Sequence, residues 1–217
     1  MAKPFLTYEQ QILILESDKL LIVPDHDYAE KTLRQIGYFA LIGGYKSPFK
    51  NLTTKKYRDG IVFDDIVALY KFDENLRELF LKYILRIERN IRSLLSYYFT
   101  EKFGESQKHY LNKANFTQNP KFIKEVSRLV NMMNNMVSND GDYPYINHYR
   151  HAHKNVPLWV LINAVTFGTL SKFYSFMTFD LKTKVSKNFD SVNERQLEQF
   201  LSVITKFRNV CAHNERL

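Results

Sequence analysis

The fold is decided by residues 63–103, FDDIVALYKFDENLRELFLKYILRIERNIRSLLSYYFTEKF. Apolar residues recur in this stretch at three- and four-residue spacing, which is the period of an amphipathic α-helix. Because the stretch contains neither glycine nor proline, it predicts one very long helix, or two helices with a bend near Asp73. Asp64 or Asp65 can cap its start, and Gly104 can end it.

Capping and breaking residues on either side of this stretch predict further helices. The expected helices are 7–17 with a Thr7–Gln10 capping box, 27–36 started by Asp27 and ended by Gly37, one from Pro120, one from Pro157 to Met177, and a last one started by Asn193 and Gln196. No segment shows the alternation that is typical of a β-strand. We therefore expect an all-α protein with about five to seven helices.

Aromatic residues are abundant enough to fill a sizeable core, because the 217 residues include 17 Phe and 14 Tyr. We expect the single tryptophan, Trp159, to lie in this core; the alternative is a surface platform on which a nucleic-acid base stacks. The last helix is expected to bury one apolar face, formed by Leu197, Phe200 or Leu201, Ile204, Phe207 and Cys211.

The chain carries a formal net charge of +8, with 31 Lys and Arg against 23 Asp and Glu. Such a balance attracts polyanions, so nucleic acid or an anionic membrane surface is a permitted partner, and plain surface charge is the alternative. Lys50, Lys55, Lys56 and Arg58 form a basic loop. This loop is either a solvated connection or a contact for a nucleic-acid backbone.

The single cysteine, Cys211, excludes an intrachain disulfide and fits a reducing compartment. The segment 1–11 lacks the apolar run of a secretory signal. The longest apolar stretch of note, 158–162, is far shorter than the roughly 20 residues that span a bilayer. We expect a soluble cytoplasmic protein with no membrane partner.

Three histidines, His148, His151 and His153, lie close together and invite a metal-site interpretation. Their spacing is not that of a zinc motif, and no cysteine lies nearby. We favour a polar surface or an RNA-contacting segment that includes Arg150, and we expect neither a metal nor a cofactor.

The candidate chemistry lies in residues 208–217, RNVCAHNERL. Asn209 and His213 are four residues apart and share a helical face, whereas Arg208 and His213 diverge by roughly 140°. Histidine suits proton transfer because its ordinary pKa of about 6.5 lies near working pH. Arginine can pair with phosphate through two hydrogen bonds, and asparagine can orient the histidine or the phosphate.

These residue types are suited to the cleavage of RNA by its own 2′-hydroxyl, without a metal ion. By spacing alone, a histidine at a helix end is more often a cap or a surface residue. Glu88 and Arg92 form a second charged pair, four residues apart on the long helix. We expect a modest surface ion pair there. The alternative is that Glu88 positions His213 or Arg208.

Several stretches together resemble the Abi-like abortive-infection proteins, the AbiD/AbiF group of the HEPN superfamily, which is defined by Arg-x4–6-His. The stretches are Gly37–Tyr45, Phe63–Arg77 with Ile87–Arg92, Pro157–Ser171 and Arg208–Leu217. The resemblance implies an N-terminal helical extension, residues 1–60, packed on an HEPN-like helical bundle, residues 61–217. Family members usually continue past the last motif, so the bundle is either a short form or is truncated at its C-terminal end.

HEPN proteins usually dimerise and bring two Arg-x4–6-His motifs into one cleft, and many are metal-independent endoribonucleases. The resemblance implies that Arg208 and His213 are catalytic, with Asn209 in support. The implied partners are RNA, a second copy of the chain, and an antitoxin protein or RNA. Because some HEPN domains only bind nucleotides or partners, the alternative is a noncatalytic RNA- or protein-binding module in phage defence.

Overall fold

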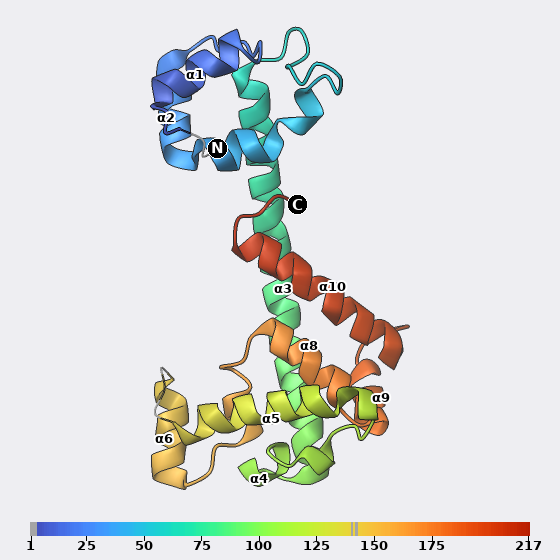
Figure 1. Cartoon of the computed structure of the whole chain (residues 1–217). Helices are drawn as coiled ribbons and strands as arrows, with labels where there is room; N and C mark the ends of the chain where they lie inside the picture. Colours follow the sequence, from blue (N-terminus) through green and yellow to red (C-terminus); the bar gives the residue numbers. More distant parts are fainter. Residues whose placement is uncertain (1–3, 140, 142) are drawn as a thin grey trace. The chain divides into compact units, whose positions relative to one another are not determined.

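The computed structural model describes residues 4–139, 141 and 143–217 (Figure 1). In this part of the chain ten α-helices are joined by loops and four short helical turns, and no β-strand is present. The all-α prediction is confirmed. The α-helices are α1 (Tyr8–Ser17), α2 (His26–Ile36), α3 (Phe63–Phe103), α4 (Gln107–Tyr110), α5 (Ile123–Ser138), α6 (Pro144–His153), α7 (Leu158–Leu161), α8 (Phe167–Phe176), α9 (Phe179–Ser186) and α10 (Glu194–Ala212). The short turns are a π-turn at Phe39–Gly43 and 3-10 turns at Ser47–Phe49, Lys113–Asn115 and Pro120–Phe122.

The chain divides into two compact units, each with its own hydrophobic core. The first unit comprises the residues up to Leu79 together with Asn214–Leu217, and the second comprises Phe80–His213. Helix α3 contributes its first part to the first unit and its remainder to the second. The predicted domain boundary after residue 60 lies within the first unit.

Helix α3 is a single helix of 41 residues, in keeping with its lack of helix-breaking residues. At its start, the Asp65 carboxylate accepts a hydrogen bond from the Val62 N–H at 2.9 Å. At its end, Gly104 adopts a φ of +94°, and its N–H donates to the Thr100 carbonyl at 2.7 Å. Glycine adopts this left-handed conformation at little cost because it has no Cβ atom, so Gly104 ends the helix as predicted.

In the first unit, local capping determines where α1 and α2 begin. The predicted capping box starts α1: the Gln10 N–H donates to Thr7 Oγ1 at 3.3 Å, and the Thr7 N–H donates to Gln10 Oε1 at 2.9 Å. Helix α2 begins at His26, earlier than predicted, because Asp25 and not Asp27 provides the cap. Gly37, with a φ of +88°, ends α2 as predicted.

A buried polar cluster in the first unit involves α3. Arg77 Nη1 donates to Asp73 Oδ2 at 2.5 Å and to the Tyr45 hydroxyl at 2.9 Å. The Tyr45 hydroxyl donates to the same carboxylate oxygen at 2.5 Å. Arg77 Nη1 also lies 3.4 Å from the carbonyl oxygen of Glu215, so residues after α10 contact this cluster.

In the second unit, the remainder of α3 packs with α4–α10 around an aromatic core. The ring of Phe99 on α3 lies 5.5 Å from that of Phe116 and 5.4 Å from that of Phe173, between centroids. Each buried ring removes roughly 150–250 Å² from water, so this cluster is a major stabilising element. Helix α10 lies beside α8 and α9 (Figure 1). None of the helices in the described part of the chain combines the length and the apolar character that crossing a bilayer requires.

The prediction of one helix from Pro157 to Met177 is wrong, because α7 and α8 are separate helices. Asn163 Nδ2 donates to the Trp159 carbonyl at 2.7 Å and to the Val160 carbonyl at 3.3 Å. The Asn163 side chain thereby occupies acceptors that a continuing helix would use. Thr166 then caps α8. This break, together with the short helices α4 and α6, raises the number of helices above the predicted value of about five to seven.

Candidate functional site

Helix α10 carries the three residues of the predicted Arg-Asn-His site. It begins with the predicted capping box, in which Asn193 Oδ1 accepts from the Gln196 N–H at 2.9 Å and Gln196 Oε1 accepts from the Asn193 N–H at 3.0 Å. Leu197, Leu201 and Cys211 are buried and face the core of the second unit. The helix therefore has a fixed start and one buried face, and its other faces are available to solvent.

The three predicted site residues lie at the C-terminal end of α10. Arg208 is half-buried, and Asn209 and His213 are exposed. The helix ends at Ala212, and the His213 N–H still donates to the Asn209 carbonyl at 3.0 Å. Asn209 and His213 therefore lie one turn apart, whereas Arg208 is rotated from His213 by roughly 140° around the helix axis.

The side chains of these three residues have no partner within the chain. Among the described residues, Arg208, Asn209 and His213 make no side-chain hydrogen bond, ion pair or ring contact. The Nε–H of Arg208 is buried and unpaired among the described residues. Buried donors are normally satisfied by protein, water or an ion, and an unsatisfied one costs roughly 1–3 kcal/mol. Arg208 is therefore a cation whose hydrogen-bonding capacity the described chain leaves unused.

An exposed apolar surface borders this end of α10. Phe200, Val203 and Phe207 recur at three- and four-residue spacing and are 48%, 50% and 42% exposed. Phe80 of α3 is 39% exposed, and its ring centroid lies 5.8 Å from that of Phe207. We call these four residues the α10 apolar face. The prediction that Phe207 is buried is wrong, because other apolar residues of α10 fill the core-facing side.

The predicted surface ion pair between Glu88 and Arg92 is instead a buried one. Glu88 is 4% exposed, and its Oε1 accepts from Arg92 Nη2 at 2.5 Å. Arg92 Nη2 also donates to the Val165 carbonyl at 3.0 Å, which links α3 to the loop before α8. Among the described residues Glu88 makes no hydrogen bond to Arg208 or His213. The pair thus stabilises the second unit and does not contact the Arg-Asn-His residues.

The predicted RNA-binding residues Lys55, Lys56 and Arg58 lie in the first unit and are exposed. Arg58 Nη2 donates to the Pro48 carbonyl at 2.7 Å, so this guanidinium is partly engaged by its own loop. The two lysines form no ion pair within the described part of the chain. They are therefore available to a phosphate backbone, which remains a prediction.

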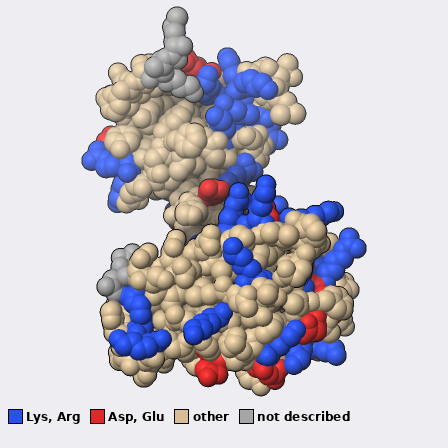
Figure 2. All heavy atoms as spheres, turned by 60° about the horizontal axis from the view of Figure 1, so that its bottom comes forward, with Lys and Arg blue, Asp and Glu red and all other residues tan. Residues whose placement is uncertain are grey.

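Further lysines gather near this basic loop. Lys50 lies 5.0 Å from the centre of the Tyr57 ring. Burial lowers the pKa of Lys50, and the positive charges of Lys46 and Lys19 lower it further. Figure 2 shows Lys and Arg atoms in several groups on the face in view, some with Asp and Glu atoms beside them. Lys19 lies far from the loop in the sequence and comes close to it only in the folded unit, so the spacing of charged residues does not reveal it.

Arg150, also predicted to bind RNA, lies in α6 of the second unit. Its Nη1 donates to the Val137 carbonyl at 3.0 Å, and its Nη2 donates to Asn147 Oδ1 at 2.9 Å. The first of these bonds ties α6 to the C-terminal end of α5, a structural role that the sequence pattern does not reveal. The ring centroids of His148 and His153 are 5.6 Å apart. Within the described residues, no group of three or more His, Cys, Asp and Glu side chains is placed to hold a metal ion.

Trp159 contradicts the prediction of a core residue, since it is 44% exposed. Its neighbours Leu158 and Val160 are buried, at 2% and 7% exposure. The single helical turn of α7 has only one face against the core, and those neighbours occupy it. The indole is therefore on the surface, where a nucleic-acid base could stack on it, as in the alternative interpretation.

The sequence of the chain matches that of a known protein family. The sequence pattern of the Abi-like proteins matches residues 31–217, which includes both helices and the whole Arg-Asn-His motif. No curated protein matches the chain. No solved structure matches it either. The chain belongs to the Abi-like protein family, and this membership implies a role in abortive infection, a form of phage defence.

Proposed function

We propose that the protein is a metal-independent endoribonuclease of HEPN type, acting in abortive infection or in a toxin–antitoxin system. The observation that carries the proposal is the grouping of Arg208, Asn209 and His213 at the end of α10 without any side-chain partner among the described residues. A histidine and an arginine that serve only to hold the fold are expected to bond to neighbouring elements, as Arg77 does to Tyr45 and Arg92 does to the Val165 carbonyl.

The proposed reaction is attack by the 2′-oxygen of RNA on the adjacent phosphorus. The new O2′–P bond forms while the P–O5′ bond breaks, which leaves a 2′,3′-cyclic phosphate and a 5′-hydroxyl. A base takes the 2′-proton, and an acid supplies a proton to the 5′-oxygen; His213 is suited to both steps. Arg208 offsets the charge that develops on the phosphoryl oxygens, and Asn209 orients the phosphate or the imidazole.

A second copy of the chain can bring an arginine and a histidine together at one phosphate. Arg208 and His213 are five residues apart on one helix, so in a single chain they diverge and do not converge on one phosphate. In a two-fold dimer, Arg208 of one copy can approach His213 of the other, which forms two composite sites with one arginine and one histidine each. The α10 apolar face lies next to these residues and offers the apolar surface that a homodimer interface buries.

The alternative is a noncatalytic RNA- or protein-binding module. The divergence of Arg208 and His213 in the single chain favours this alternative if the protein is a monomer. Toxin–antitoxin membership and an antitoxin partner rest on the resemblance, whereas a cytoplasmic location rests on the single cysteine; all three belong to the same proposal.

Mixed variants test the proposal. Purified protein is incubated with labelled RNA in EDTA, and Arg208→Ala and His213→Ala are compared with Arg195→Ala, an exposed arginine at the other end of α10. We expect the first two variants to lose cleavage and the control to retain it. Mixing the two inactive variants should restore part of the activity, because one composite site then contains an intact Arg208 and an intact His213. RNA binding without cleavage, unchanged by either substitution, would support the noncatalytic alternative.

A further inference from the structure

A pocket in the second unit is lined by residues of α3 and α7. Its volume is about 520 Å³, within the usual range of about 300–1,000 Å³ for small-molecule sites. Two aromatic residues and four polar ones line it: Trp159, Tyr97, Ser93, Ser96, Thr100 and Glu101. We call it the Trp159 pocket. It takes no part in the chemistry proposed for α10.

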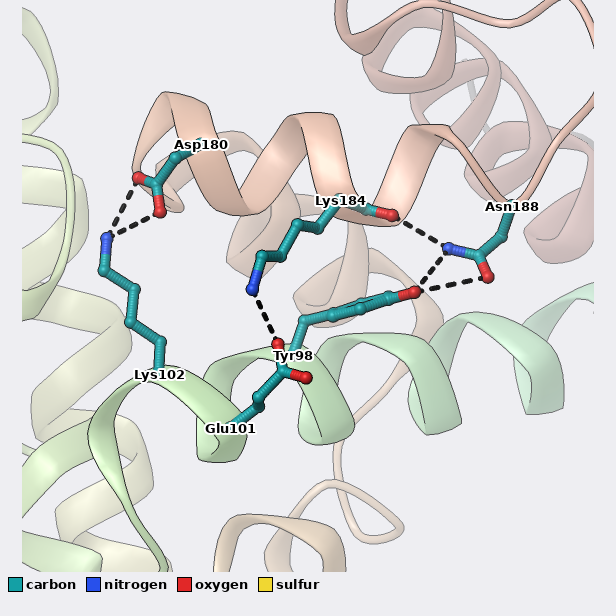
Figure 3. Close-up of polar contacts among 6 residues, drawn as sticks. All are labelled: Tyr98, Glu101, Lys102, Asp180, Lys184 and Asn188. Carbon is teal, nitrogen blue, oxygen red and sulfur yellow. Dashed lines mark hydrogen bonds and ion pairs between the residues drawn. The ribbon is translucent and has the colours of Figure 1, made fainter.

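The aromatic walls of the Trp159 pocket are exposed, and a neighbouring ring supports one of them. Trp159 is 44% exposed and Tyr97 is 61% exposed. The Tyr97 ring packs edge-to-face on Tyr98, with centroids 5.2 Å apart. The Tyr98 hydroxyl accepts from Asn188 Nδ2 at 3.1 Å, so the turn after α9 fixes the ring that supports Tyr97 (Figure 3). A ring held in this way loses little conformational entropy when a planar ligand stacks on it.

The polar groups of the pocket are available to a ligand. Thr100 Oγ1 is buried and has no hydrogen-bond partner among the described residues. Ser96 Oγ donates to the Arg92 carbonyl at 2.8 Å, which leaves its lone pairs free to accept. The Glu101 carboxylate accepts from Lys184 Nζ at 2.7 Å (Figure 3). Because Lys184 offsets the charge of Glu101, this wall repels a phosphate less than a free carboxylate does.

A row of cations on α3 leads to the pocket. Lys82, Arg86 and Arg89 precede Ser93 at three- and four-residue spacing, so they share the face of α3 that carries the pocket residues. All three are exposed, and within the described part of the chain none of them forms an ion pair. An aromatic pocket beside an unneutralised row of cations is the arrangement with which proteins bind single-stranded nucleic acid.

We propose that the Trp159 pocket holds one unpaired base of a single-stranded RNA, whose backbone runs along Lys82, Arg86 and Arg89. A duplex does not fit this description, because its bases are already stacked inside the helix. The pocket hydroxyls can bond to base edges and to the ribose 2′-hydroxyl, which favours RNA over DNA. The inference rests on RNA being the substrate of the proposed nuclease, and it assigns a substrate-binding role to α3.

The single tryptophan makes a direct test possible, since Trp159 provides all of the indole fluorescence of the chain. The measurement uses the full chain carrying His213→Ala, titrated with a short unstructured RNA, the DNA of the same sequence, and an RNA duplex. We expect the single-stranded RNA to quench the fluorescence of Trp159, the DNA to do so at higher concentration, and the duplex to leave it unchanged.

Affinity is measured in parallel by anisotropy of a labelled RNA. We expect Tyr97→Ala or Trp159→Leu to weaken binding by about 5- to 150-fold, the range for loss of one stacked base. Arg89→Gln should lower the slope of log affinity against log salt by about 0.7, the value for one single-strand phosphate contact. The matched controls are Phe179→Ala, a 74% exposed ring on α9, and Arg195→Gln on α10; neither should change binding.

Absence of quenching by single-stranded RNA overturns the inference. This holds even if Tyr97→Ala fails to fold, because the fluorescence titration is made on a protein whose pocket is unaltered. Equal quenching by DNA would show that the pocket does not select RNA. Equal quenching by the duplex or by an acidic peptide would show that the pocket does not select an unpaired base. Cleavage without quenching would support the nuclease proposal and reject the role proposed for this pocket. Quenching without cleavage would support RNA binding in the pocket and reject the nuclease proposal.

Discussion

Glu88 Oε1 accepts a hydrogen bond from Arg92 Nη2 at 2.5 Å, one turn further along α3. The Glu88 side chain is only 5% exposed, and its other oxygen, Oε2, has no hydrogen-bond partner among the described residues. The charge of this carboxylate is therefore compensated by Arg92. A buried carboxylate with one counterion depends strongly on that counterion, because removing it leaves an uncompensated charge in the protein interior.

The first prediction follows from this pair. Arg92→Met keeps the apolar stem and removes the charge, and we expect it to destabilise the second unit by about 3–5 kcal/mol. Lys184→Met is the matched control: it removes the partner of Glu101, an exposed acid on the same helix, and should cost about 1 kcal/mol or less. Denaturant unfolding, with hydrogen exchange to localise the change, measures both. Equal effects of the two substitutions would contradict the buried role of Glu88.

The second prediction concerns the buried cluster of the first unit. Arg77 and Asp73 are 2% and 7% exposed, and Tyr45 bonds to both. Arg77→Met should destabilise this unit by about 3–5 kcal/mol, since it leaves the carboxylate with the tyrosine hydroxyl as its main donor. Tyr45→Phe removes a hydrogen bond but keeps the charge pair, so it should cost less, about 1–3 kcal/mol. Hydrogen exchange in the first unit measures this order, and a larger loss for Tyr45→Phe contradicts it.

The third prediction is a dependence on pH. Lys102 donates to both oxygens of Asp180, and this hydrogen bonding lowers the pKa of Asp180 below its ordinary value of 3.8 (Figure 3). Because the pKa is lower in the folded state, the pair stabilises the protein above about pH 4, and this contribution disappears as the pH falls through the lowered pKa. The pair is exposed and screened by water, so it contributes less than about 1 kcal/mol.

Asp180→Asn tests this dependence against the unaltered chain. At pH 7 we expect the variant to unfold at a slightly lower denaturant concentration. As the pH falls through the lowered pKa of Asp180, the difference between the two proteins should shrink, because the carboxyl group then becomes protonated in the folded chain as well as in the unfolded chain. A difference that stays constant as the pH falls would show that Asp180 acts through its shape or capping rather than through its charge.

Local signals in the sequence account for most of the helices. The lack of helix breakers predicts α3, and the capping boxes at Thr7 and Asn193 predict the starts of α1 and α10, since caps depend on residues a few positions apart. The break after α7 was missed because Asn163 competes for backbone acceptors through its side chain, which apolar spacing does not record.

The burial of individual side chains was harder to predict. Glu88 is buried, and its partner Arg92 donates to the carbonyl of Val165, a contact between residues far apart in the sequence that residue spacing does not reveal. Phe207 and Trp159 are exposed although both occur in apolar patterns, because each helix has more apolar residues than its buried face can hold. For the candidate site, the sequence predicts the identities of Arg208, Asn209 and His213. It cannot predict that they lack partners within the described chain, since this depends on every element that packs nearby.

The fourth prediction tests the proposed homodimer. Phe207→Asp places a charge in the α10 apolar face and should weaken dimerisation by 30-fold or more, about 2 kcal/mol or greater, as for a central interface aromatic. Phe179→Asp is the control, since Phe179 is 74% exposed on α9 and lies outside that face. Analytical ultracentrifugation over a range of concentrations measures the effect. A wild-type chain that stays monomeric throughout, or a dimer that Phe207→Asp leaves intact, rules out this interface.

The chemistry of the cut RNA tests the central claim most directly. An RNA with one mapped cleavage position is compared with the same RNA carrying a single 2′-deoxy residue on the 5′ side of that position, both in EDTA. The proposed roles of His213 and Arg208 predict a 2′,3′-cyclic phosphate on the first RNA and no cut at that position in the second. Cleavage of the 2′-deoxy RNA, or activity that appears only on addition of a metal ion, would contradict attack by the 2′-hydroxyl at an Arg-His site.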